Sequence, residues 1–181
     1  MKTVGILLSG RGSNMVALVE AGIAVGLVAS DKPDAPGIAW AKARDIPTFA
    51  LSPKGIGKAA YEAQVDAALR EAGCEVIALA GYMRLLSDDF VARWRDRIIN
   101  IHPSLLPKYK GLDTHARAIA AGDTVAGCSV HVVTEELDAG ALLGQAEVPV
   151  LPDDGPDTLA ARVLEAEHRL YPRVLKEFAS R

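Results

Sequence analysis

Short apolar runs alternate with segments of helical periodicity through the first hundred residues, and this alternation limits the possible folds more than any other feature. Continuous short apolar runs are typical of strands that are buried on both faces. The expected strands are 4–8, 24–30, 46–51, 75–80 and 97–101, and the expected helices are 14–21, 37–44, 58–72 and 88–95. Strand and helix in strict alternation predict a doubly wound parallel sheet that helices cover on both faces.

The pattern changes in the last third of the chain. A helix over 114–121 is followed by two long runs, 125–134 and 142–150, and by a final helix over 156–178. Polar and apolar residues alternate in both runs, which predicts a largely antiparallel pair of strands. No linker, repeat or low-complexity stretch interrupts the chain. We therefore expect a single α/β domain over residues 1–181, with a mostly parallel sheet, antiparallel late strands and helices on both faces.

The composition is that of an ordinary globular domain and argues against several classes of function. Of the 181 residues, 50% are hydrophobic and only 5% are aromatic, so Ala, Val, Leu and Ile must form most of the core. A net charge of −3 argues against a protein that binds nucleic acid mainly through phosphates. The apolar run after Met1 is too short for a signal peptide or a membrane span, so we expect a cytoplasmic protein without membrane contact.

Cysteine and histidine spacing does not predict a metal site. Cys74 and Cys128 lie far apart and belong to no CxxC motif, so we expect two small buried side chains in a reducing compartment. The four histidines have neither HExxH spacing nor thiolate neighbours.

The segment SGRGSN, residues 9–14, lies between the first expected strand and the first expected helix, which Ser13 or Asn14 is expected to cap. Backbone N–H groups at a helix N-terminus carry partial positive charge, and glycines let a phosphate approach closely. Met15 stands where a dinucleotide fingerprint has its third glycine, so a mononucleotide-type phosphate site is favoured. Two alternatives stay open: a glycine turn without a ligand, and a NAD-binding module in which Asp31 holds a ribose.

Asn100 and His102 stand two residues apart at the carboxyl end of the fifth expected strand. Side chains two apart in a strand point to the same side, and open α/β sheets bind ligands at this end. An Asn amide can donate to an oxyanion, and His can carry a proton near neutral pH. The pair, followed by the proline-rich loop 103–107, predicts a catalytic site, although a structural role is the simpler interpretation of a single strand-end His.

Two further segments could complete such a site. A carboxylate of the turn TEELDAG, residues 134–140, could pair with His102, although a solvated acidic hairpin explains the turn equally well. The segment GYMRLL, residues 81–86, could line a pocket for a flat ring or an acidic tail, or simply pack in the core. Glu167 is expected by default on the solvated face of the last helix.

Taken together, SGRGSN, GYMRLLS, NIHPSLLPKYKG, SVHVVTEELDAG and AEHRLYP occur in the order and spacing of one enzyme family. Over residues 4–178 the chain resembles the glycinamide ribonucleotide formyltransferases, the folate-dependent enzymes of purine synthesis. The resemblance implies that the amine of glycinamide ribonucleotide attacks the formyl carbon of 10-formyltetrahydrofolate, the formyl-donor cosubstrate. It implies these two small molecules as partners, no metal, and no nucleic acid or membrane; a homodimer is compatible with it.

The resemblance also implies roles for individual residues. Gly12, Ser13 and Asn14 would hold the ribonucleotide phosphate, and Glu167 its ribose. The folate-binding residues would be Lys58, Met83, Arg84, Leu85, Leu86, Asn100, Thr134, Glu135, Glu136, Leu137 and Asp138. The catalytic residues would be Asn100, His102 and Asp138. Asn100 and His102 would stabilise the oxyanion, while Asp138 would support His102 and the proton transfer from amine to leaving nitrogen.

Two positions depart from the family pattern. Asp113 stands where the family usually has the first His of Gly-Leu-His-Thr-His, where it could influence His102 or cap the following helix. Leu164 stands where some relatives have a phosphate-binding Lys. A formyltetrahydrofolate deformylase and a methionyl-tRNA formyltransferase are the close alternatives, but each normally carries a further domain for which we expect no room in this chain.

Overall fold

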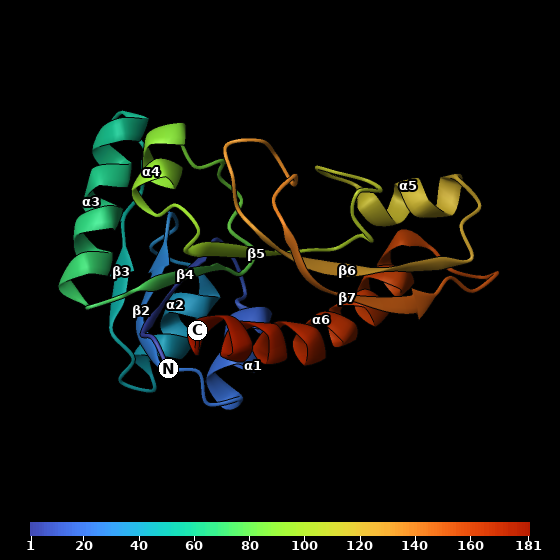
Figure 1. Cartoon of the computed structure of the whole chain (residues 1–181), viewed down its shortest axis with the longest axis horizontal. Helices are drawn as coiled ribbons and strands as arrows, with labels where there is room; N and C mark the ends of the chain where they lie inside the picture. The colour runs from blue at the N-terminus through green and yellow to red at the C-terminus, as the bar shows by residue number, and fades with distance from the viewer.

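The computed structural model describes all residues 1–181 and contains one sheet of seven strands, in the order β3-β2-β1-β4-β5-β6-β7 (Figure 1). The strands are β1 (Val4–Leu8), β2 (Val25–Ser30), β3 (Thr48–Ala50), β4 (Val76–Leu79), β5 (Ile98–His102), β6 (Val125–Val132) and β7 (Leu142–Pro149). The helices are α1 (Ser13–Glu20), α2 (Pro36–Lys42), α3 (Lys58–Glu71), α4 (Asp88–Arg93), α5 (Thr114–Ala120) and α6 (Pro156–Ala179).

Strands β1 to β5 are parallel, whereas β6 pairs antiparallel with both β5 and β7. The predicted fold class, a doubly wound and mostly parallel sheet with antiparallel late strands, is therefore confirmed. Every predicted helix and strand is present, and the ends differ by at most two residues. Strand β5 extends to His102, so this residue belongs to the strand and does not lie in the loop behind it.

Helices cover both faces of the sheet (Figure 1). Helices α1, α2 and α6 pack on one face, where Leu18, Ile38 and Leu170 are buried with the aliphatic side chains of the central strands. Helices α3 and α4 pack on the other face, where Leu69 and Phe90 are buried. Because both faces are covered, the short apolar runs of β1 and β4 are buried throughout, as their sequence predicts.

The course of the chain reverses between β1 and β4. The first strands run outward from β1 through β2 to β3, and the chain then returns to place β4 on the other side of β1. Loops that leave two neighbouring parallel strands in opposite directions open a crevice at the carboxyl ends of those strands. The glycine loop, residues 9–14, follows β1, and the segment 81–86 follows β4, so both lie at this crevice.

The predicted N-cap of α1 differs from the structure. Gly12, in the left-handed region at φ 75°, is the N-cap of α1, and Ser13 is already the first helical residue. A glycine is favoured there because a Cβ would meet the backbone of Gly37 at 3.2 Å and side chains on two sides. The N-cap of α4 is Ser87, whose Oγ accepts a hydrogen bond from the backbone N–H of Phe90.

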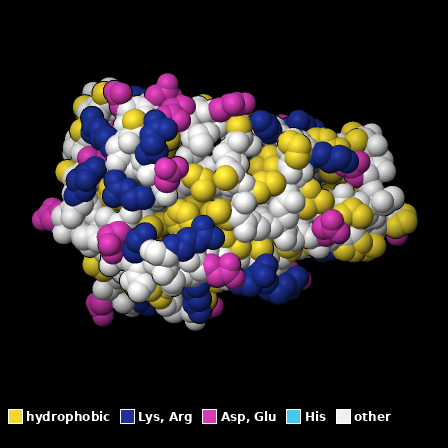
Figure 2. Space-filling view, viewed as in Figure 1, with side chains coloured by type: hydrophobic (Ala, Val, Ile, Leu, Met, Phe, Trp, Pro, Cys, Tyr) yellow, Lys and Arg dark blue, Asp and Glu magenta, His cyan; other side chains and the backbone are white.

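Both cysteines are buried and unpaired, as predicted, and burial raises the pKa of Cys74 to about 11 and that of Cys128 to about 12. No helix combines the length and the apolar character needed to cross a bilayer. On the face seen in Figure 1, Lys and Arg side chains lie among Asp and Glu side chains, and apolar side chains gather near the middle (Figure 2).

Candidate active site

Two adjoining cavities lie at the carboxyl ends of β4 and β5. The first cavity, of about 500 Å³, extends from Asn100 to Lys58 at the start of α3. The second cavity, of about 420 Å³, is lined by His102 and by the loop that leads into α5. The residues that line both are Tyr82, Arg84, Leu85, Asn100, Leu137 and Asp138. A ligand in either cavity would therefore reach the same polar wall.

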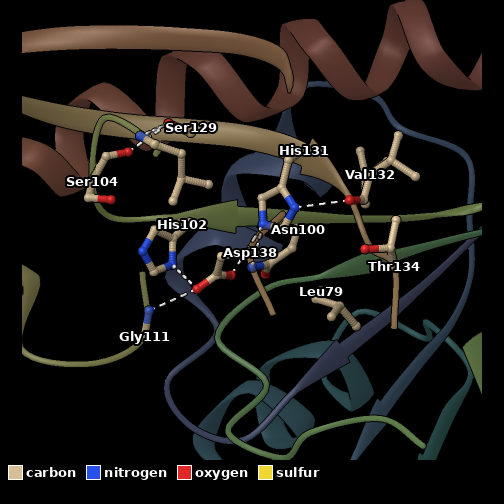
Figure 3. Close-up of polar contacts among 12 residues, drawn as sticks. Leu79, Asn100, His102, Ser104, Gly111, Ser129, His131, Val132, Thr134 and Asp138 are labelled. Carbon is tan, nitrogen blue, oxygen red and sulfur yellow. Dashed lines mark hydrogen bonds and ion pairs between the residues drawn. The ribbon is translucent and has the colours of Figure 1, made fainter. Parts of the chain in front are cut away.

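His102 is buried at the end of β5, and both of its ring nitrogens face oxygen atoms. Nε2 lies 2.8 Å from the carbonyl oxygen of Tyr109, and Nδ1 lies 3.5 Å from Oδ2 of Asp138 (Figure 3). A carbonyl oxygen can only accept, so Nε2 carries a hydrogen in this arrangement. A second proton, on Nδ1, would then be directed at the Asp138 carboxylate. Each ring nitrogen of His102 therefore has an oxygen acceptor within reach.

Asp138 lies between two imidazoles. Its Oδ2 accepts a hydrogen bond from the backbone N–H of Gly111 at 2.9 Å, and its Oδ1 lies 3.5 Å from Nε2 of His131. Burial disfavours ionisation, but the contacts with His131, Gly111 and His102 outweigh burial and hold the pKa of this carboxyl below its ordinary value. Asp138 is therefore a carboxylate at neutral pH although its side chain is buried.

His131 completes this group of polar side chains, and the sequence did not single it out as a site residue. It lies opposite Asn100 in the antiparallel pair of β5 and β6, with Nε2 3.3 Å from Asn100 Nδ2. Its Nδ1 donates to the carbonyl oxygen of Val132 at 3.0 Å, and its Nε2 faces both the Asn100 amide and Asp138 Oδ1. Only the strand register could have revealed it: once β6 is aligned with β5, a buried His faces the Asn.

Asp113 and His115 both line the second cavity. Asp113 is at the N-cap of α5 in the left-handed region, φ 56°, but its side chain makes no capping hydrogen bond, so the capping role is wrong. Its carboxylate is exposed at the cavity. Burial and the charge of His102 lower the pKa of His115, which leaves His115 neutral beside that cavity.

The predicted ribonucleotide-binding residues lie apart from these cavities, and none of them lines either one. The structure nevertheless brings two of them together from opposite ends of the chain. Nδ2 of Asn14, in the first turn of α1, donates to Oε2 of Glu167 on α6 at 2.8 Å, and both side chains are buried. The default expectation that Glu167 lies on a solvated helix face is therefore wrong. Burial raises its pKa, and the hydrogen bond from Asn14 opposes that shift.

The predicted folate-binding residues are divided between the two cavities. Those lining the first cavity are Lys58, Arg84, Leu85, Leu86, Asn100, Thr134, Glu135, Glu136, Leu137 and Asp138. Met83 lines only the second cavity and is largely exposed. Glu135 pairs with Arg95 at 2.8 Å, and Glu136 lies 3.8 Å from Lys110, so surface cations partly neutralise these two acids at the rim.

Asp31 turns into the protein. Its Oδ1 accepts a hydrogen bond from Ser9 Oγ at 2.6 Å, and the side chain is buried. In the NAD-binding alternative this carboxylate would face a ribose, so the structure offers that alternative no support. No group of three or more His, Cys, Asp or Glu side chains is arranged to hold a metal ion.

The chain is similar to known formyl transferases in sequence and in structure. Residues 2–175 match the family model described as "Formyl transferase". The chain is 50% identical to a phosphoribosylglycinamide formyltransferase from Brucella melitensis whose crystal structure superposes with a TM-score of 0.94, over 99% of this chain and 96% of that one. It is 40% identical to a phosphoribosylglycinamide formyltransferase of Haemophilus influenzae, over 98% of this chain and 87% of the relative.

A longer relative matches as well. The trifunctional purine biosynthetic protein adenosine-3 of Drosophila melanogaster is 45% identical over an alignment that covers 96% of this chain. The chain spans only 14% of the length of that protein.

Proposed function

The chain belongs to the formyl transferase family, and from this premise we propose that it transfers the formyl group of 10-formyltetrahydrofolate to the amine of glycinamide ribonucleotide. The products would be formylglycinamide ribonucleotide and tetrahydrofolate, in purine biosynthesis. One observation carries the proposal: Asn100, His102 and Asp138 meet at the wall where two ligand-sized cavities adjoin. The names of the bacterial relatives, which align along most of their length, support the same reaction.

The first cavity suits the folate. Aliphatic side chains such as Leu85 and Leu86 offer apolar surface to a flat ring, while Lys58 and Arg84 place two cations beside it. A Lys and an Arg can bind the carboxylates of a glutamate tail, the Arg with two parallel hydrogen bonds. When bound, the folate supplies the formyl carbon that the amine attacks. We assign Thr134, Glu135, Glu136 and Leu137 to the other side of this cavity.

The N-terminus of α1 suits the ribonucleotide. The backbone N–H groups of Ser13 and Asn14 are free at the start of the helix, where partial positive charge favours a phosphate. Oδ1 of Asn14 is buried without a protein partner, and such an atom favours a ligand that donates a hydrogen bond. Glu167, which accepts a hydrogen bond from Asn14, would accept another from a ribose hydroxyl.

Asn100 and His102 would stabilise the negative charge that develops on the formyl oxygen as the amine adds to the carbon. In the structure the Asn100 amide faces His131, and His102 donates to the carbonyl oxygen of Tyr109. Each side chain must therefore exchange a protein partner for the reacting oxygen. Asp138 holds His102 from the opposite ring nitrogen. As a carboxylate, Asp138 can accept the proton that the attacking amine loses and return it to the leaving folate nitrogen as the bond from the formyl carbon to that nitrogen breaks.

A direct assay tests the proposal. The protein is mixed with 10-formyltetrahydrofolate, with and without glycinamide ribonucleotide, and release of tetrahydrofolate is followed spectrophotometrically. Release that requires the ribonucleotide supports the transferase, whereas equal release in its absence indicates a deformylase. No release in either mixture would indicate a binding protein without this chemistry. We place the reaction in the cytoplasm, where a reducing environment suits two unpaired cysteines.

A further inference from the structure

The hydroxyl of Ser9 joins three segments that lie far apart in the sequence. Ser9 follows β1, Asp31 follows β2 and Met83 follows β4, and these three strands are neighbours in the sheet. Ser9 Oγ donates to Asp31 Oδ1 at 2.6 Å and accepts from the backbone N–H of Met83 at 2.9 Å. The Ser9 and Asp31 side chains are 3% and 7% exposed, so water competes little for these bonds.

Asp31 decides which way the hydroxyl points. A carboxylate can only accept hydrogen bonds, so the Ser9 hydrogen must be directed at Asp31. The lone pairs of Ser9 Oγ are then left facing the Met83 N–H, which can only donate. Asp31 forms no ion pair with a Lys, Arg or His that would draw it away from this contact.

The bond to Met83 holds a segment that borders both cavities. Met83 lines the second cavity, and Arg84 and Leu85 line both. The backbone fixes the same segment a second time, because the Ser9 N–H donates to the carbonyl oxygen of Gly81 at 3.0 Å. Ser9 thus forms two hydrogen bonds with the segment 81–86, one to Gly81 and one from Met83, and together they fix the backbone of the segment where it follows β4.

Ser9 is also the first residue of the glycine loop that leads to Asn14. The far side of this loop is held by α2, whose Gly37 N–H donates to the carbonyl oxygen of Gly10 at 3.1 Å. A displacement of the loop by a bound phosphate would therefore act on Ser9, and through Ser9 on the segment 81–86.

We propose that Ser9, oriented by Asp31, is a positioning residue that couples the ribonucleotide-binding loop to the segment that lines the folate cavity. This inference rests on the proposed function, in which the two ligands occupy these two places. Neither residue contacts a substrate in this assignment. Their effect is to make the binding of one ligand favour the geometry that the other requires.

The hydrogen bond itself is tested without any ligand, by amide exchange of Met83 followed by NMR. In Ser9→Ala, exchange at Met83 should be about tenfold faster, the order expected for the loss of one backbone hydrogen bond. Asp31→Asn should stay near the parent rate, because the amide oxygen still accepts from Ser9, whereas Asp31→Ala should exchange faster. The matched control is Ser30→Ala. Ser30 is a buried serine at the carboxyl end of β2, and its Oγ accepts only from the Lys32 N–H.

The coupling is tested by calorimetry with glycinamide ribonucleotide and tetrahydrofolate, a pair that cannot react. The affinity of each is measured alone and with the other bound. In the parent protein and in Asp31→Asn and Ser30→Ala, each ligand should tighten the other severalfold. In Ser9→Ala and Asp31→Ala this factor should approach one, while the ribonucleotide alone binds almost as before.

The measurements distinguish a failure of the proposed function from a failure of the role assigned to Ser9. A parent protein that binds neither ligand contradicts the proposed function, whereas the exchange rates still test the role of Ser9 at the segment. Unchanged exchange at Met83 in Ser9→Ala, or unchanged coupling in that variant, overturns the inference and leaves the formyl transfer intact. If Asp31→Asn and Asp31→Ala lost amide protection at Met83 and ligand coupling to the same extent, the orienting role of Asp31 would be overturned.

Discussion

Asn14 Nδ2 donates a hydrogen bond to Glu167 Oε2 at 2.8 Å and so connects the first turn of α1 to the long C-terminal helix across 153 positions of sequence. Both side chains are buried, and the remaining amide oxygen of Asn14 has no protein partner. In the proposed function this pair, with its free acceptor at a helix N-terminus, binds a ligand that carries both a phosphate and hydroxyl groups.

Removing the Glu167 carboxylate should weaken ribonucleotide binding. In Glu167→Ala the KM for glycinamide ribonucleotide should rise about 10- to 100-fold, the range for a hydrogen bond to a charged group, with a smaller change in kcat. Glu165→Gln, on the exposed side of the same helix, serves as the control in steady-state kinetics. A KM equal to that of the parent would refute the ribose contact.

The raised pKa of Glu167 predicts a pH dependence of stability. Because burial lifts the folded pKa above that of the unfolded chain, the stabilisation from this group is fully present below the ordinary Glu value and is lost as pH rises through the folded pKa. The free energy of unfolding of Glu167→Gln, minus that of the parent, should therefore be larger at pH 7 than at pH 4. Urea unfolding at both pH values measures the difference, and the same difference at each pH would argue against a raised pKa.

Substitutions in the proposed catalytic group should act on turnover and not on ribonucleotide binding. His102→Ala and Asp138→Asn should each lower kcat by about 10² to 10⁴, the usual contribution of a positioned acid or base. Calorimetric affinity for the ribonucleotide should change little, because α1 lies outside both cavities. If either variant turned over at a near-normal rate, its assigned role would be wrong.

His131 should matter for stability as well as for turnover. His131→Leu removes the buried imidazole that Asp138 Oδ1 and Asn100 Nδ2 both face, and a buried polar group left without a partner costs about 1 to 3 kcal/mol. We expect the free energy of unfolding, measured with urea, to fall by about that amount, and kcat to fall as well. His131→Asn, which restores a polar side chain, should recover part of both; no recovery would indicate that only packing is involved.

The glycine loop offers a matched pair of substitutions. Gly12→Ala places a Cβ 3.0 to 3.2 Å from its neighbours at a positive φ, so it should lower the free energy of unfolding by about 1 to 3 kcal/mol. A Cβ at Gly10 would meet no atom within 4 Å, so Gly10→Ala should change the free energy of unfolding by about 0.5 kcal/mol or less. Equal effects in thermal or urea unfolding would show that the left-handed conformation of Gly12 is not required.

Much of the candidate site was predictable because its residues stand at strand ends. Asn100 and His102 could be placed at the carboxyl end of β5 from periodicity alone, since side chains two apart in a strand share a side. The partner of His102 was predicted only as a carboxylate somewhere in the turn 134–140. The resemblance then singled out Asp138, the residue of that turn that the structure places 3.5 Å from the imidazole.

Three features could not be predicted locally. The N-cap of α1 was assigned to Ser13 or Asn14 from propensity, whereas close packing against Gly37 demands Gly12. Glu167 has the sequence context of a solvated helix face, and only the packing of α1 on α6 buries it. His131 was one of several polar residues in an alternating run until the strand register placed it opposite Asn100.

The alternation of strands and helices, the buried character of the central strands and the polar residues at their ends follow from local sequence pattern. These properties depend on neighbours a few positions away, through side-chain periodicity and turn chemistry. Three contacts arise only when the chain folds: Asp138 lies between His102 and His131, Asn14 donates to Glu167, and Ser9 forms hydrogen bonds with both Asp31 and Met83. Such contacts depend on the order of strands in the sheet and on the register between them, and no local pattern carries that information.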